Sequence, residues 1–311
     1  MNDWQVKIPV VLLIFNRPDT TEKVFEVIRK AKPPKLFVVA DGPRPDRPED
    51  IKKCAAARAI VDQVDWECQV LTNYSEMNLS CQHRVSSGLN WVFENVEEAI
   101  ILEDDCIPHI TFFRFCEELL ERYRNDERIM VISGQNVQFG RQRFDYSYYF
   151  SRYNHYWGWA TWKRAWKYFD FDMKLWSKVR EAGLLQDILR DPHVVKVWTH
   201  VFDSVYNGRV NSWGQRWTFA CWINSGLTIL SNVNLVSNVG AGRYDATHTK
   251  KATPYSNIPA EEMTFPLKHP ELMIRDAIAD DFSQDLCFDY LPTVWKRVKL
   301  KLKKIFKNIK R

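Results

Sequence analysis

The residues best suited to chemistry are three adjacent acids, Glu103, Asp104 and Asp105, which directly follow the apolar residues 100–102. A short continuous apolar run is typical of a strand buried on both faces, as in a parallel sheet. Such a strand delivers the residues after it to the carboxyl edge of the sheet, where open α/β sheets bind ligands. Three adjacent carboxylates repel one another, so this position favours a bound Mg²⁺ or Mn²⁺. A solvated acidic turn is the alternative interpretation.

The elements that would position these acids can be predicted from the pattern of apolar residues. Strands are predicted at residues 8–15, 35–40, 67–72, 99–102, 129–133, 146–153 and 227–235. Helices are predicted at residues 19–30, 51–64, 80–93, 111–124, 171–209 and 213–226. Because strands and helices alternate with short connections in the first half, we expect an α/β fold with a mostly parallel sheet flanked by helices.

Composition and charge limit the classes of protein to consider. The chain has 311 residues, 45% of them apolar and 27% charged, as in ordinary globular proteins. Seven cysteines without a CxxC pair argue against a disulfide framework or zinc site and indicate a reducing compartment. Residues 1–6 are polar and the apolar run 10–15 is short, which argues against a signal peptide. A cytoplasmic location is therefore expected.

Aromatic residues gather in the second half of the chain. Nine of the thirteen tryptophans lie between Trp157 and Trp222. Indole rings can form a thick core, and they can also stack on the C–H faces of sugar rings. Trp157 and Trp159 are the candidates for such a platform, with membership of the core as the alternative for both.

Several motifs occur in a fixed order: FNRP at 15–18, ADGPR at 40–44, LEDDC at 102–106, YFSRY at 149–153, WGWATW at 157–162, and VSN followed by ATHT within 236–249. This set resembles the GT-A nucleotide-sugar glycosyltransferases, in particular bacterial glycosyltransferase-like proteins and the N-acetylglucosaminyltransferases with an EDD motif. The resemblance implies a Rossmann-like GT-A domain over residues 1–250. An irregular extension at 251–292 and a tail at 293–311 would follow it.

The resemblance also implies roles for residues that bind the nucleotide. Arg17 would be an anion-binding group near the nucleotide, and Asp41 would accept a hydrogen bond from the uracil N–H. Asn78 and Arg84 stand where the family places nucleotide and phosphate contacts. Without the resemblance, Arg17 would be interpreted as a surface arginine and Asp41 as a turn residue.

The same resemblance assigns the acids. Asp105 would bind Mn²⁺ or Mg²⁺, Asp104 would face the ribose or the metal's water shell, and Glu103 would support both from behind. His248 would add a ligand to the metal or the diphosphate, with an ordinary loop histidine as the alternative. The implied activity is the transfer of a sugar from a UDP-type donor to a glycan or lipid-linked acceptor, with inversion. The metal would stabilise the charge that develops on the leaving diphosphate.

One motif departs from the family pattern. The resembled proteins have Trp-Asp-x-x-Trp, and that Asp is the expected catalytic base, whereas residues 213–217 here read WGQRW with Gly214 in its place. Asp203 and Asp245 are the acids nearest in sequence. The departure leaves open a catalytically silent protein that binds nucleotide sugars. A nucleotidyltransferase is excluded, because residues 16–19 contain no glycine for a phosphate loop.

The last nineteen residues have a composition of their own. Residues 293–311 carry nine Lys/Arg and no acid, so residues 1–292 have a net charge of −4 against +5 for the whole chain. A mildly acidic body argues against nucleic acid as a partner. Apolar residues in the tail recur at spacings of three and four, which predicts a basic amphipathic helix lying on an anionic membrane surface. This would hold the protein at the inner membrane face.

Overall fold

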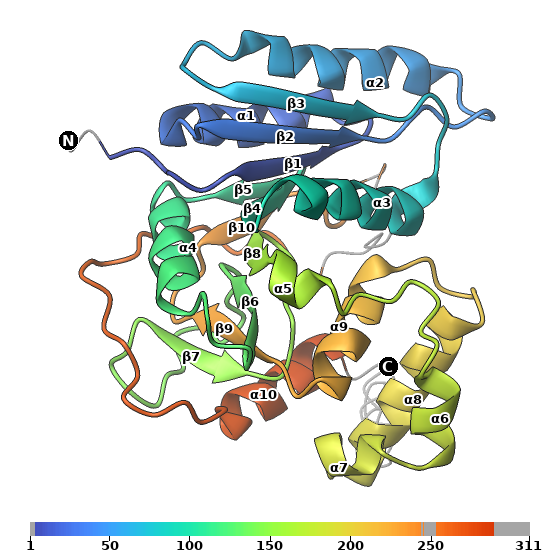
Figure 1. Ribbon diagram of the computed structural model, residues 1–311, viewed down its shortest axis with the longest axis vertical. Coiled ribbons are helices and arrows are strands. Elements are labelled where there is room, and N and C mark those ends of the chain that lie inside the picture. Colours follow the sequence, from blue (N-terminus) through green and yellow to red (C-terminus); the bar gives the residue numbers. More distant parts are fainter. Residues whose placement is uncertain (1–3, 244, 246–252, 289–311) are drawn as a thin grey trace, which may run out of the picture.

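The structure is a computed structural model of the chain, and it describes residues 4–243, 245 and 253–288 (Figure 1). Eight strands form one sheet in the order β3-β2-β1-β4-β8-β6-β9-β7. Their bounds are β1 Val10–Ile14, β2 Lys35–Ala40, β3 Gln69–Tyr74, β4 Glu98–Glu103, β6 Ile129–Ser133, β7 Tyr148–Ser151, β8 Trp159–Trp162 and β9 Leu227–Ser231.

The sheet is mixed but mostly parallel. Strands β3, β2, β1 and β4 pair in parallel, as do β6 and β9, whereas β8 and β7 run antiparallel to their neighbours. The prediction of an α/β chain with a mostly parallel sheet and flanking helices is therefore confirmed. The antiparallel strand β8 was not predicted, because residues 157–162 are three tryptophans and three small residues without a clear alternation.

Helices cover both faces of the sheet because its central strands are apolar on both sides. Val10, Leu12 and Ile14 of β1 belong to one core, while Val11 and Leu13 belong to the other. The first core is covered by α1 (Pro18–Ala31), α2 (Glu49–Ala59) with the 3₁₀ turn η1 (Ile60–Gln63), and α4 (Thr111–Arg122). The second is covered by α3 (Ser80–Asn95), α5 (Lys163–Trp166), α6 (Trp176–Glu181), α7 (Leu185–Leu189), α8 (Pro192–Tyr206) and α9 (Trp213–Ile223).

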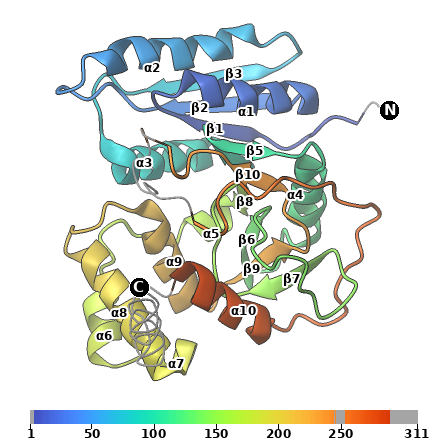
Figure 2. The ribbon, with the colours of Figure 1, turned by 180° about the vertical axis from the view of Figure 1, so that it is seen from behind.

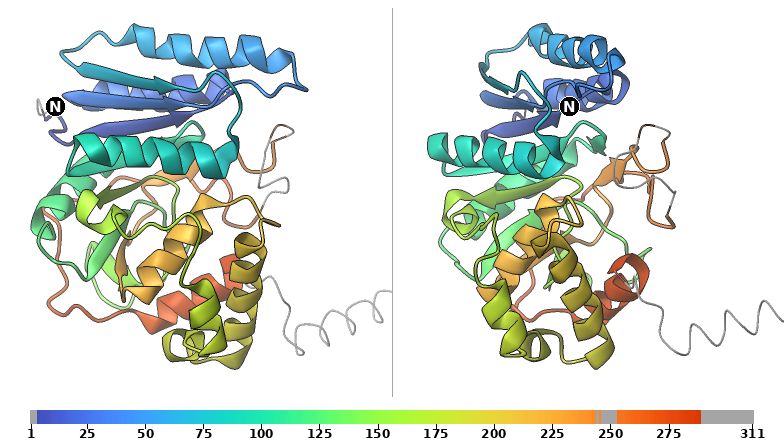
Figure 3. Two further views of the ribbon diagram at one scale, coloured as in Figure 1. Left: turned by 45° about the vertical axis from the view of Figure 1, so that its right-hand side comes forward. Right: turned by 90° about the vertical axis from the view of Figure 1, so that its right-hand side faces the viewer.

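The figures show this layering directly. Helix α3 lies in front of the sheet in Figure 1, and α1 lies in front of it when the molecule is seen from behind in Figure 2. In Figure 3, α3 runs between the blue N-terminal strands and the yellow-green helices α6–α9. Indole rings fill much of the second core, and of the nine tryptophans from Trp157 to Trp222, all within the described residues, only Trp157 is partly exposed.

The order of the strands creates a switch point between β1 and β4. The chain moves outward from β1 through β2 to β3, and then returns through α3 to place β4 on the other side of β1. Connections therefore leave these two neighbouring strands in opposite directions. In open α/β sheets, the crevice at the carboxyl ends of such a strand pair is where ligands bind.

The segment from residue 253 to 288 packs back on the sheet. Its helix α10 (Ala277–Ser283) presents the buried Asp280, which accepts hydrogen bonds from Ser151 Oγ at 2.5 Å and Arg275 Nη1 at 2.8 Å. In the π-helical turn η2 (Gln284–Phe288), Gln284 Oε1 accepts from Tyr153 and from Trp198, both at 2.8 Å. A two-stranded sheet joins β5 (Cys106–Pro108) to β10 (Val236–Asn238).

Among the helices within the described residues, none combines the length and the apolar character needed to cross a membrane. The predicted tail helix at 293–311 lies outside the described residues.

Candidate functional site

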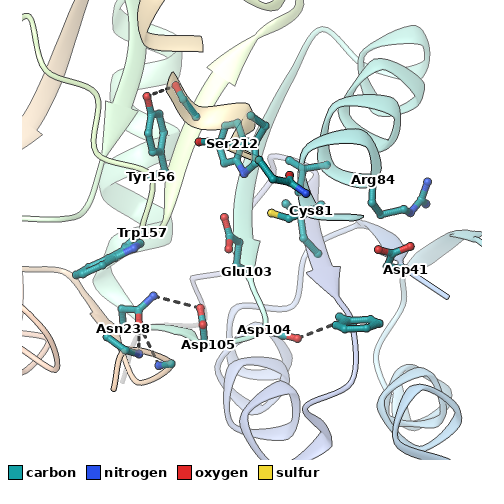
Figure 4. Close-up of a pocket in the computed structure, with 18 of the residues that line it drawn as sticks. Asp41, Cys81, Arg84, Glu103, Asp104, Asp105, Tyr156, Trp157, Ser212 and Asn238 are labelled. Atoms are coloured by element: carbon teal, nitrogen blue, oxygen red, sulfur yellow. Dashed lines mark hydrogen bonds between the residues drawn. The ribbon is translucent and has the colours of Figure 1, made fainter. Parts of the chain in front are cut away.

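A pocket of about 450 Å³ opens at the carboxyl ends of β1, β2 and β4. It lies at the switch point of the sheet, and its far wall is formed by residues 154–157 and by the start of α9. In Figure 4, Asp104 and Asp105 lie below, Tyr156 and Ser212 lie above, and Glu103 lies between them, with Trp157 at the left and Asp41 at the right. The predicted residues that line the pocket are Arg17, Asp41, Asn78, Arg84, Asp104, Asp105 and Trp157.

Asp104 and Asp105 form the turn directly after β4 and are both buried. Arg17, in the turn after the adjacent strand β1, donates from Nη1 to Asp105 Oδ2 at 2.7 Å. The same nitrogen lies 3.6 Å from Asp104 Oδ1, and Asp104 Oδ2 accepts from the backbone N–H of Phe15 at 3.1 Å. Burial alone would lower the pKa of Arg17, but the neighbouring carboxylates of Asp104 and Asp105 outweigh it, and its pKa is raised.

Asn238, the last residue of β10, and Gly240, in the loop after it, also adjoin Asp105. Asn238 Nδ2 donates to Asp105 Oδ1 at 3.2 Å, and Asn238 Oδ1 accepts from the N–H groups of Gly240 and Ala241. A Cβ at residue 240 would come within 1.8 Å of Asp105 Oδ2. Glycine is therefore required there for the carboxylate to have space.

Glu103 is the last residue of β4 and lines the pocket, so it does not lie behind the two aspartates. In Figure 4 its carboxyl group is seen between Trp157 and Cys81. Within the described part of the chain, this carboxyl group has no hydrogen-bond or ion-pair partner. Burial, together with the charges of Asp105 and Asp104, raises the pKa of Glu103. Burial and the charge of Asp105 also raise the pKa of Asp104.

Asp41 follows β2 and anchors the start of α3. Its Oδ1 accepts from the backbone N–H groups of Leu79 at 2.8 Å and Gly42 at 2.9 Å, while Oδ2 accepts from Asn78 Nδ2 at 3.0 Å. Burial raises the pKa of Asp41 although these N–H groups oppose the effect. The side chain of Asn78 is also bonded to the backbone of Gly42 and Ser80, so it ties the two loops together.

Arg84 lines the pocket from α3, but its guanidinium is engaged in hydrogen bonds within the protein. Its guanidinium donates to the carbonyl of Ala40 at 3.1 Å and to the carbonyl and side-chain oxygens of Asn73 at 2.6 and 2.8 Å. Burial lowers the pKa of Arg84. This arginine therefore braces the ends of β2 and β3 at the edge of the pocket.

The structure separates the two tryptophans that were candidates for a sugar platform. Trp157 is partly exposed, lines the pocket and lies 5.9 Å from the ring of Tyr255. Trp159 is fully buried in β8, where it stacks on Trp213 at 5.6 Å, so it offers no face to a ligand. The reason is that Trp159 is the first residue of β8, a strand covered on both faces, and its ring enters the second core, whereas Trp157 precedes the strand. His248 lies outside the described residues.

Gly214, which stands where the resembled motif has an aspartate, packs against the ring of Tyr156. Gly214 lines the pocket, and a Cβ there would come within 2.6 Å of Tyr156 Cε2. Tyr156 also donates its hydroxyl to the carbonyl oxygen of Gly214 at 2.5 Å. Neither nearby acid supplies a carboxylate here, because Asp203 on α8 accepts hydrogen bonds from Trp176 and Arg180 of α6, and Asp245 pairs with Arg243. Neither lines the pocket.

Sequence reasoning missed several residues of the pocket. Arg44 lies over the ring of Phe15 at 5.5 Å and pairs with the buried Asp50 at 2.6 Å. It belongs to the ADGPR motif, which was a usable signal. Tyr255 and Phe288 come from the irregular C-terminal segment, which offered no signal of any kind.

The resemblance implies a bound Mg²⁺ or Mn²⁺, which needs several oxygen ligands close together. Across residues 4–243, 245 and 253–288, no three His, Cys, Asp or Glu side chains are arranged to hold a metal ion. The donor atoms are nevertheless carboxylate oxygens, which suit Mg²⁺ or Mn²⁺. Arg17 is the guanidinium that pairs with Asp104 and Asp105, and burial, followed by the charges of the neighbouring carboxylates, raises the pKa values of Glu103 and Asp104. The chemistry of the donors fits a divalent cation, and in this structure Oδ2 of Asp105 accepts from Arg17.

No protein-family model and no curated protein matches the chain. Among solved structures, it is similar to the mannosyltransferase PcManGT from Pyrobaculum calidifontis in complex with GDP-Man and Mn²⁺, with 13% sequence identity and a TM-score of 0.35. The similarity covers 51% of this chain, and the chain spans 45% of that protein. Because a similarity of this size carries no argument, we base the proposed function on the geometry of the pocket.

Proposed function

We propose that this chain is a GT-A-type glycosyltransferase that takes a sugar from a nucleoside-diphosphate donor. The observation that carries this proposal is the convergence of Arg17, Asp104 and Asp105 at the carboxyl ends of β1 and β4, the switch point of a mostly parallel sheet. A site with both an arginine and buried carboxylates suits a ligand that combines anionic groups with a cation. A pocket of about 450 Å³ has the size typical of a site for a small molecule.

The two sides of the pocket suggest how the donor would lie. Asp41, after β2, would face the base, which for a UDP sugar is uracil. The diphosphate would lie near Arg17, and the sugar would point toward Trp157 and Tyr255 on the opposite wall. The carboxyl group of Glu103 is free to accept hydrogen bonds from sugar hydroxyls. The acceptor in this proposal is a glycan or a lipid-linked sugar.

A divalent cation, Mn²⁺ or Mg²⁺, is part of the proposal. Asp105 would hold it, with Asp104 close enough to bind it or its water shell. When bound, such a cation supplies stabilisation of the negative charge on the leaving diphosphate. The residues of this chain bind and orient the two halves of the donor, and Asn238 fixes the carboxylate of Asp105 by its hydrogen bond.

A second candidate is a protein that binds nucleotide sugars without transferring them. The packing of Tyr156 against Gly214 favours it, because no carboxylate can stand at residue 214 while the ring occupies that space. The two candidates share the donor site and differ only in turnover.

Turnover of donors distinguishes them. The chain would be incubated with a panel of UDP and GDP sugars and Mn²⁺, and both binding and release of free nucleotide would be measured, with EDTA and the variant Asp105→Asn as controls. Metal-dependent release of nucleotide from one donor supports the transferase. Binding of a donor without release supports the silent protein, and absence of binding to every donor contradicts both.

A further inference from the structure

Arg17 and Asp105 form an ion pair that is largely buried. The two side chains are 12% exposed each, and the atoms Nη1 and Oδ2 lie 2.7 Å apart. The residues follow neighbouring parallel strands, β1 and β4, so the sheet itself brings them together. The other oxygen of Asp105 accepts from Asn238. Both carboxylate oxygens of Asp105 are therefore already bonded to the protein.

The ion pair uses the two charges that the proposed ligands would need: the carboxylate of Asp105 for the cation and the guanidinium of Arg17 for the diphosphate. A divalent cation that binds Asp105 has to displace Arg17, and a diphosphate that binds Arg17 has to draw it away from Asp105. Either ligand alone would leave one charge of the pair buried without its partner. Breaking a buried pair by removing one partner is costly for this reason. The two ligands together leave no charge unpaired, because each takes one member of the pair.

The remaining contacts of Arg17 allow such a change of partner. Among the described residues, its second nitrogen, Nη2, donates to the carbonyl oxygen of Asp245 at 3.4 Å. The contact to Asp104 is 3.6 Å long, which is an ion pair without a hydrogen bond. Of the contacts that Arg17 makes with described residues, the bond to Asp105, at 2.7 Å, is therefore the strongest. The side chain also lines the pocket, where a phosphate can reach it.

We infer that the site accepts a divalent cation and a nucleoside diphosphate as one complex, and that Arg17 passes from Asp105 to the diphosphate as the cation takes its place. This inference rests on the proposed function. It goes further by making Arg17 a positioning residue that opposes binding of the cation alone and favours binding of the diphosphate. The two affinities are then coupled through one side chain, and the coupling is reciprocal.

The test is the variant Arg17→Met, which keeps much of the length of the side chain and removes its charge. Binding of Mn²⁺ without nucleotide is measured from the loss of the free-ion electron paramagnetic resonance signal. We expect Arg17→Met to bind Mn²⁺ alone at least tenfold more tightly than the wild type, which corresponds to about 1.4 kcal/mol. With saturating Mn²⁺, calorimetry should show UDP binding at least tenfold more weakly. Opposite signs for the two ligands are the signature of the exchange.

Arg44→Met is the matched control. Arg44 also lines the pocket, but its guanidinium pairs with Asp50 at 2.6 Å and not with Asp105. Its loss should change the affinity for Mn²⁺ alone by less than twofold. Arg17→Gln is a second variant that removes the charge while keeping polar atoms, and the same two changes are expected of it should Arg17→Met fail to fold.

Two results would overturn the inference. One is an affinity for Mn²⁺ alone in the folded Arg17 variants that is no higher than in the wild type, including the case in which neither binds. The other is an equal gain in Arg44→Met, which would reduce the effect to net charge. Failure of the proposed function looks different, since the wild type with Mn²⁺ would then bind no nucleoside diphosphate. The measurement with Mn²⁺ alone contains no nucleotide and still decides the exchange.

Discussion

The ring of Tyr156 occupies the space that a side chain at Gly214 would need, with 2.6 Å between Tyr156 Cε2 and the place of a Cβ at residue 214. The hydroxyl of Tyr156 also contacts Thr218 Oγ1 on the next turn of α9. The position of the Tyr156 ring therefore requires a glycine at residue 214. An acid at this position, as in the Trp-Asp-x-x-Trp motif, would thus require a different packing of Tyr156.

Gly214→Ala should lower the free energy of unfolding by about 1–3 kcal/mol, because the added methyl group overpacks a rigid ring. Combined with Tyr156→Ala, the same substitution should cost less than the sum of the two single changes. Urea denaturation of the four proteins measures this. Tyr156→Phe is the control, since it keeps the ring and should give no relief. Additive costs in the pair with Tyr156→Ala would contradict the contact.

Asp105→Asn should weaken Mn²⁺-dependent binding of UDP at least tenfold, roughly 1.4 kcal/mol, and leave the fold intact. The physical reason is the loss of the anionic oxygen that the cation needs. Calorimetry with and without Mn²⁺ provides the measurement. The exposed Asp187 is the control, and Asp187→Asn should bind as the wild type does. Unchanged Mn²⁺-dependent binding of UDP in Asp105→Asn would contradict the assignment of Asp105 as a ligand of the cation.

Asp41→Ala should weaken binding of UDP more than binding of ADP, if the carboxylate recognises the uracil N–H. The same change removes the acceptor of two backbone N–H groups and of Asn78. It should therefore also cost about 2 kcal/mol of stability. Calorimetry with both nucleotides is to be paired with thermal denaturation.

The control for this experiment is Asp46→Ala, because the side chain of Asp46 is 76% exposed in the loop that follows β2. It should change neither property. Equal losses for UDP and ADP in Asp41→Ala would leave Asp41 with its anchoring role alone.

His155 should make the protein sensitive to acid. Burial lowers the pKa of His155 to about 4, and its Nε2 has no hydrogen-bond partner among the described residues. Above pH 6.5 the ring is neutral in both the folded and the unfolded chain. As the pH falls from 6.5 to 4, only the unfolded chain takes up the proton, so stability is lost over this range, by roughly 3 kcal/mol in total.

His155→Gln should therefore reduce the difference in unfolding free energy between pH 7 and pH 4 by about this amount. Urea denaturation at the two pH values gives the comparison. His200, which is exposed on α8, provides the control, and His200→Gln should retain the difference of the wild type. The same loss on acidification in His155→Gln and the wild type would rule out His155 as the source.

The tail at 293–311 lies outside the described residues and remains a prediction from its sequence. Nine basic residues should each contribute ~1 kcal/mol near an anionic surface, with burial of the apolar stripe in addition. The full chain should sediment with phosphatidylglycerol vesicles at low salt, and a chain ending at Pro292 should not. Recovery of both in the supernatant would show that the tail is not an anchor.

The sequence by itself determined the succession of strands and helices around the acids. The apolar runs before Asp41 and Glu103 predicted β2 and β4 because the pattern of a buried strand is local. The parallel arrangement then followed from the alternation of strands with helices. The resemblance placed Arg17, Asp41 and Asp105 in one site, and the structure has all three lining one pocket at the carboxyl ends of the strands.

Tertiary structure alone decided what these residues contact. Arg17 and Asp105 are 88 residues apart, and no local pattern encodes their bond. The inward turn of Trp159, the outward position of Trp157 and the entry of Phe288 into the pocket depend in the same way on packing between distant segments. Local periodicity specifies which residues are apolar and on which face they lie. Which partner meets that face is decided only when the layers close.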